Sequence, residues 1–90
     1  MILELYEIIS ERKTKPKSGS YTNSLFEAGQ EQIIQKVGEE AIELVLAAAG
    51  QGDQRLIEES ADLIYHLWVL LAFREIPLEA IKNELERRHA

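Results

Sequence analysis

Residues 36–66 read KVGEEAIELVLAAAGQGDQRLIEESADLIYH. The stretch contains two pairs of acidic residues, and the members of each pair are three positions apart: Glu40 with Glu43, and Glu59 with Asp62. Each pair lies in a segment of strong helical character, and a Gly-Gln-Gly-Asp turn separates the two segments. Residues three or four apart share one face of a helix, and a tight turn makes consecutive helices antiparallel neighbours. The sequence therefore predicts that four carboxylates from two helices converge on one place.

Carboxylates that lie so close together repel one another and need a compensating positive charge. Ligation by oxygen atoms alone suits Mg²⁺, with Mn²⁺ as the alternative, and does not suit zinc, which prefers nitrogen and sulfur. We therefore expect Glu40, Glu43, Glu59 and Asp62 to bind Mg²⁺, while an acidic helix face in solvent is the simpler interpretation. A di-iron bundle fits less well, because the one Glu-x-x-His motif ends at His89, far from both acidic pairs.

The spacing of apolar residues predicts an all-α fold. Helices are expected over residues 2–12, from Ser24 onward, over about 30–49, over about 53–74 and from Pro77 onward. No segment alternates with the period of a strand, so we expect a helical bundle of about four to five helices forming a single domain over residues 1–90. The helix that follows Asp62 is apolar almost all round, which indicates that a second copy covers part of it in a homodimer.

Composition narrows the classes of partner. The 90-residue chain has 16 acidic side chains against 10 Lys and Arg, giving a formal net charge of −6, whereas nucleic-acid binders present basic surfaces. It contains no cysteine, which excludes disulfides and thiolate chemistry. The N-terminus lacks the pattern of a signal peptide, and the longest apolar run is too short to cross a bilayer. We expect a cytoplasmic protein with neither a nucleic-acid nor a membrane partner.

Basic residues gather in one segment of this acidic chain. Residues 13–23 are rich in helix breakers and are expected to form a loop, and Arg12, Lys13, Lys15 and Lys17 lie in or next to it. The loop is either an ordinary solvated connection or a mobile cationic strap for phosphate groups.

Several motifs along the chain resemble one family. The acidic signature resembles that of the all-α, MazG-like nucleoside triphosphate pyrophosphohydrolases, and within that superfamily the chain looks like the phosphoribosyl-ATP pyrophosphatases of histidine biosynthesis. The more specific motifs are Gly19-Ser20-Tyr21-Thr22, Lys36-Val37-Gly38-Glu39-Glu40-Ala41, Ala61-Asp62-Leu63 and Tyr65-His66-Leu67. The resemblance implies hydrolysis of phosphoribosyl-ATP to phosphoribosyl-AMP and pyrophosphate, the second step of histidine biosynthesis, by a Mg²⁺-dependent homodimer. Some members of the family are fused to the cyclohydrolase of the next step, and because 90 residues leave no room for that domain, we expect it on a separate chain.

Roles can be assigned to the residues around the acidic signature. Alongside the four metal ligands, Glu39 or Glu43 is a candidate general base. Lys36 either binds phosphate or forms a salt bridge with Glu40 one turn away. Candidate substrate contacts elsewhere, each of which could instead be structural, are Lys17, Ser20, Tyr21, Thr22 and His66. Two other functions stay open: a house-cleaning nucleoside triphosphate pyrophosphohydrolase, and a non-catalytic helical dimerisation module.

Overall fold

The structure, a computed structural model, describes residues 1–89. Its elements are α1 (Ile2–Thr14), α2 (Tyr21–Ala28), α3 (Gln30–Gly50), α4 (Asp53–Phe73) and α5 (Leu78–His89). No strand occurs in this part of the chain, so the prediction of an all-α fold with four to five helices is confirmed. None of these helices is both long enough and apolar enough to cross a membrane.

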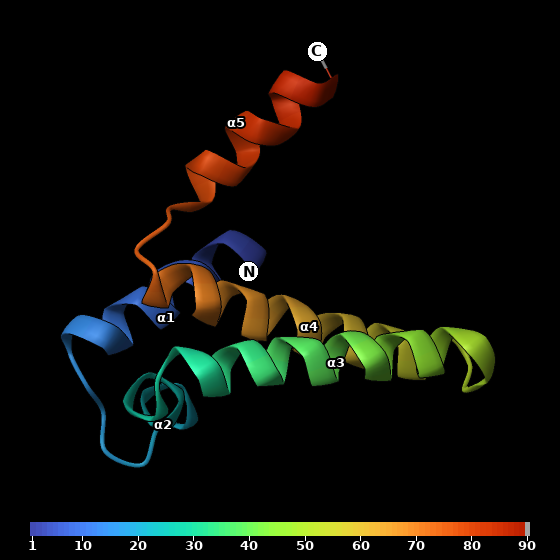
Figure 1. The fold of residues 1–90 in the computed structure, drawn as a ribbon, viewed down its shortest axis with the longest axis horizontal. Coiled ribbons are helices and arrows are strands. Elements are labelled where there is room, and N and C mark those ends of the chain that lie inside the picture. Colours follow the sequence, from blue (N-terminus) through green and yellow to red (C-terminus); the bar gives the residue numbers. More distant parts are fainter. Residues whose placement is uncertain (90) are drawn as a thin grey trace.

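Helices α3 and α4 form a long antiparallel hairpin that organises the fold (Figure 1). Each helix is 21 residues long, and the chain reverses direction between them at Gln51 and Gly52. Gly52 has a φ of 89°, a left-handed conformation that glycine adopts without steric cost. Asp53 follows as the first residue of α4, where a carboxylate interacts favourably with the helix dipole. The turn therefore sets the two acidic pairs on neighbouring helices, as the sequence predicted.

The core lies toward the end of the hairpin remote from its turn. There α1 packs along α4, and α2 packs against the start of α3 (Figure 1). The buried cluster consists of Ile9, Leu25, Ile33, Val69 and Ala72. Toward the turn, by contrast, large apolar side chains are exposed on both helices of the hairpin: Ile42, Val45, Leu46 and Ile57. One half of the hairpin is thus covered by this chain's own helices, and the other half is not.

The segment between α1 and α2 is shorter than the sequence predicted. Helix α1 continues to Thr14, and α2 begins at Tyr21 rather than at Ser24. The N-cap is Ser20, whose Oγ accepts a hydrogen bond of 3.3 Å from the backbone N–H of Asn23. Ser24 lies inside the first turn and donates its hydroxyl to the Tyr21 carbonyl over 2.6 Å. The prediction failed because two serines four residues apart can each cap a helix, and the earlier one does so here.

Asn23 joins the two ends of this connection. Its Nδ2 donates to the carbonyl oxygen of Arg12 over 2.7 Å, and its Oδ1 accepts from the backbone N–H of Lys17 over 2.8 Å. The Asn23 side chain is buried, so the nitrogen and the oxygen of its amide group both need these partners. The connection is therefore held against α2 by a side chain of α2 itself.

Lys13 has a structural role at the end of α4. Its Nζ donates to the carbonyl oxygens of Ala72, at 3.3 Å, and Phe73, at 2.8 Å, and it lies over the Phe73 ring. These carbonyls belong to the last turn of α4, where a cation also interacts favourably with the helix dipole. One of the four basic residues of the suspected cationic strap is thus engaged in holding α1 to α4.

Lys13→Met is expected to lower the free energy of unfolding by about 1 kcal/mol, because the carbonyls of Ala72 and Phe73 lose their charged donor. Lys17→Met is the matched control, since the Lys17 side chain is exposed and this residue forms its hydrogen bonds through its backbone N–H and carbonyl groups. Urea unfolding followed by circular dichroism measures both. Equal stability of the two variants would contradict the structural role of Lys13.

Candidate metal centre

Three of the four predicted metal ligands come together where α3 and α4 pack. One carboxylate oxygen from each of Glu40, Glu59 and Asp62 lies within 4.8 Å of the others. Glu40 comes from the middle of α3, while Glu59 and Asp62 lie three residues apart on α4 and share one of its faces. Oxygen ligands on opposite sides of a Mg²⁺ ion are about 4.2 Å apart, because each bond is about 2.1 Å long. The three oxygens therefore have the chemistry to ligate one such ion, and the 4.8 Å limit on their separations is close to the spacing that the ion requires.

Burial differs sharply among the three carboxylates. The Glu59 side chain is only 7% exposed and that of Glu40 is 13% exposed, whereas Asp62 is exposed. The cluster thus has a buried side against the helix pair and an open side toward solvent. An ion bound there could keep water ligands or accept ligands from a substrate on its open side.

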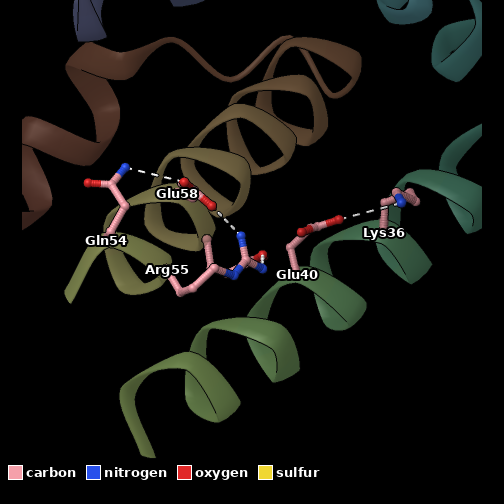
Figure 2. Close-up of polar contacts among 6 residues, drawn as sticks. Lys36, Glu40, Gln54, Arg55 and Glu58 are labelled. Carbon is pink, nitrogen blue, oxygen red and sulfur yellow. Dashed lines mark hydrogen bonds and ion pairs between the residues drawn. The ribbon is translucent and has the colours of Figure 1, made fainter. Parts of the chain in front are cut away.

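Figure 2 shows a basic side chain on each helix beside an acidic one, Lys36 beside Glu40 on α3 and Arg55 beside Glu58 on α4. On α3, the Nζ of Lys36 lies 3.5 Å from a carboxylate oxygen of Glu40, one turn away. On α4, the guanidinium of Arg55 donates to both Glu58 and Glu59. The salt bridge between Lys36 and Glu40 that the sequence offered as one interpretation is present in the structure.

The flanking cations stay charged at neutral pH. Partial desolvation lowers the pKa of Lys36, but the nearby Tyr21 and Glu40 raise this pKa above its ordinary value overall. Hydrogen bonds to Glu58 and then to Glu59 raise the pKa of Arg55. The same Arg55 contact, helped by a hydrogen bond from Gln54, lowers the pKa of Glu58.

Arg55 was not among the residues predicted from the sequence. A usable signal was present, because Arg55 lies three positions before Glu58 and four before Glu59, the spacings at which helical side chains meet. It was overlooked because such pairs are common on helix surfaces, and spacing alone does not show that Glu59 is buried.

Two predicted carboxylates lie outside the cluster. Glu43 and Glu39 are both exposed on α3, and neither belongs to the group of oxygens within 4.8 Å. Glu43 follows Glu40 by three residues and shares its helix face, whereas Glu39 is rotated by about 100° from Glu40. The structure thus brings together Glu40, Glu59 and Asp62 without Glu43, whose role as a ligand stays a prediction.

The start of α2 is connected to α4 through His66, a residue of α4. The Nδ1 of this buried histidine lies 2.7 Å from the carbonyl oxygen of Asp62, and its Nε2 lies 3.0 Å from the Tyr21 hydroxyl. Because a carbonyl can only accept, Nδ1 carries a proton, and in the neutral ring Nε2 accepts from Tyr21. Both ring nitrogens of His66 thus have partners within the chain, as a structural histidine would.

Other predicted substrate contacts also have partners within the chain. Thr22 hydrogen bonds to the Tyr65 hydroxyl, and burial raises the pKa of Tyr65 despite the opposing effect of this hydrogen bond. Ser20 serves as the N-cap of α2, as described above. Lys17, Ser20 and Tyr21 also line a surface cavity of about 790 Å³. The structure therefore places these residues together beside α4, with several of their polar groups already engaged.

Comparison with known proteins agrees with this geometry. Residues 2–89 match the family described as phosphoribosyl-ATP pyrophosphohydrolase. The chain belongs to this family. A relative from Listeria innocua named phosphoribosyl-ATP pyrophosphatase is 57% identical over 88 residues, which cover 98% of this chain and 84% of the relative. An archaeal relative of the same name, from Methanocella arvoryzae, is 47% identical over 87 residues, covering 94% of this chain and 92% of the relative. The resemblance seen in the sequence motifs is thus confirmed.

Tyr21→Phe is expected to lower the free energy of unfolding by about 1 kcal/mol, because His66 loses the hydroxyl on its Nε2. Binding of Mg²⁺ should be unchanged, since Tyr21 is not in the carboxylate cluster. Urea unfolding and calorimetric Mg²⁺ titration of the same variant test both statements. Unaltered stability would show that the hydrogen bond to His66 contributes nothing to the fold.

Proposed function

We propose that the chain hydrolyses phosphoribosyl-ATP to phosphoribosyl-AMP and pyrophosphate in the cytoplasm, as the second step of histidine biosynthesis. The observation that carries the proposal is the group of three carboxylate oxygens within 4.8 Å on the contact face of α3 and α4. Membership of the phosphoribosyl-ATP pyrophosphohydrolase family over residues 2–89 supports the choice of substrate. The acidic cluster thus indicates where the reaction takes place, and membership of the family indicates which substrate is hydrolysed.

The proposed cofactor is Mg²⁺, and the donor set fits it because all three ligand atoms are carboxylate oxygens. Glu40, Glu59 and Asp62 would hold the ion, with Asp62 on the solvent side. When bound, Mg²⁺ would neutralise the triphosphate chain and activate a water molecule for attack at phosphorus.

The residues of the chain have separate tasks in this proposal. The Lys36 ammonium, 3.5 Å from Glu40, provides a positive charge beside the cluster for the departing pyrophosphate. A carboxylate outside the cluster accepts the proton of the attacking water, and Glu43 is better placed for this than Glu39 because it shares the helix face of Glu40. His66 and Tyr21 hold the start of α2 beside α4.

We further propose that the working form is a homodimer. The half of the hairpin near its turn exposes Ile42, Val45, Leu46 and Ile57, with between 49% and 62% of each side chain accessible. Several exposed large apolar side chains on adjoining helices are typical of a surface that another subunit covers. Because α3 and α4 also carry the carboxylates, dimerisation would stiffen the two helices that hold them.

The decisive assay is pyrophosphate release from phosphoribosyl-ATP, measured beside ATP, dATP and dUTP, with Mg²⁺ and with EDTA. We expect hydrolysis of phosphoribosyl-ATP only when Mg²⁺ is present. Preference for ordinary or deoxynucleoside triphosphates would instead establish a house-cleaning pyrophosphohydrolase. Absence of turnover on every substrate would favour a non-catalytic helical module.

In the same assay Glu40→Gln, Glu59→Gln and Asp62→Asn should each lower kcat/KM by at least about a hundredfold, since each removes a metal ligand. Their circular dichroism spectra should stay helical. Glu43→Gln tests the fourth predicted ligand: a ligand role requires weaker Mg²⁺ binding, whereas a role as base requires lower kcat with unchanged Mg²⁺ affinity. Wild-type turnover in the Glu40→Gln variant would overturn the assignment of the metal site.

Ile42→Lys should weaken the proposed dimer by about a hundredfold or more, because it buries an unpaired charge twice in a symmetric interface. Sedimentation velocity across a range of protein concentrations measures this effect. Gln32→Lys is the matched control, since it adds the same charge at an exposed polar position of α3. Equal association of the two variants would show that Ile42 lies outside any subunit contact.

A further inference from the structure

Arg55 is placed to compete with a metal ion for the most buried carboxylate of the cluster. Its Nη2 donates to Glu59, and its Nη1 donates to Glu58 on the outer side of α4 (Figure 2). The Glu59 side chain is 7% exposed, while 44% of the Arg55 side chain is accessible. One partner of the ion pair is therefore fixed inside the helix pair, and the other is free to change its position.

Groups of the chain itself balance part of the charge around the cluster. The three carboxylates of the cluster and Glu58, which shares Arg55, stand against two flanking cations, Lys36 and Arg55. A divalent cation bound to Glu59 would stand close to the Arg55 guanidinium, and like charges at such a separation repel. Free Mg²⁺ must therefore bind against Arg55, and its affinity is lower than three carboxylates alone would give.

A phosphate group changes this balance. It brings negative charge to the open side of the cluster and offers oxygen atoms that match the fork of a guanidinium. Arg55 can then exchange its contact with Glu59 for a contact with phosphate, without leaving any buried charge unpaired, because the ion takes its place beside Glu59. The exposure of the Arg55 side chain makes this exchange sterically open.

We propose that Arg55 selects metal–phosphate complexes over the free metal ion: it weakens binding of Mg²⁺ alone and strengthens binding of Mg²⁺ together with a di- or triphosphate. This inference rests on the proposed function, because it takes the carboxylate cluster to be the metal site. It assigns Arg55 as a phosphate-binding residue of that site.

A purely structural role of Arg55 leads to a different prediction for the two binding affinities. If the guanidinium only held Glu59 in its rotamer, its removal would disorder a ligand and weaken both kinds of binding. Selection requires the two affinities to move in opposite directions. The sign of each change therefore separates the two roles without any measurement of turnover.

The experiment is isothermal titration calorimetry on the full chain with Arg55→Gln. Mg²⁺ alone should bind about tenfold more tightly than to wild type, because a repelling unit charge is removed. Pyrophosphate titrated in saturating Mg²⁺ should bind about tenfold more weakly, because a charge-assisted hydrogen bond is lost. Arg55→Lys keeps the charge but not the fork, so its Mg²⁺ affinity should stay near wild type while its pyrophosphate affinity falls part of the way.

Arg87→Gln is the matched control, because Arg87 forms an equivalent ion pair with Glu84 three residues away on α5. It should leave both affinities unchanged. Weaker binding of both ligands by Arg55→Gln, or no change in either, overturns the selection role while leaving the metal site intact. If Mg²⁺ binding by wild type is equal to that of Asp62→Asn, the proposed metal centre fails and this inference falls with it.

Discussion

The fold depends on how three carboxylates are accommodated at the contact between α3 and α4. Repulsion among Glu40, Glu59 and Asp62 would push the two helices apart if nothing opposed it. Lys36 and Arg55 oppose it from within the chain, one from each helix. The helices can therefore pack closely with Glu59 buried between them, and the site keeps a geometry that a divalent ion could enter.

The sequence predicted those parts of the structure that follow from local spacing. The two acidic pairs, the Gly-Gln-Gly-Asp turn and the helical periodicity were enough to place Glu40 beside Glu59 and Asp62. Spacing does not determine rotamers, however. Glu43 shares the face of Glu40 and yet lies outside the cluster. Residues on one helix face differ by 100° or less around the helix axis, but each side chain can still adopt several rotamers that point in different directions.

Contacts between residues far apart in the sequence could not be predicted for a different reason. Lys13 contacts the end of α4, 59 and 60 positions later, and Tyr21 reaches His66, 45 positions later. Nothing in the local pattern distinguishes a lysine that caps a distant helix from one that extends into solvent. The sequence accordingly left open whether the basic segment is a solvated connection or a phosphate strap, and it did not indicate that Lys13 contacts the end of α4.

The buried amide of Asn23 has a consequence for what this position can tolerate. Its nitrogen faces the Arg12 carbonyl and its oxygen faces the Lys17 N–H, so only one orientation of the amide forms both hydrogen bonds. Conversion to aspartate, whether by substitution or by deamidation with age, would set a negative oxygen against a carbonyl oxygen in a buried position. The isosteric replacement would thus release the junction between the first two helices, which makes Asn23 a point where slow chemical damage would loosen the whole connection between α1 and α2.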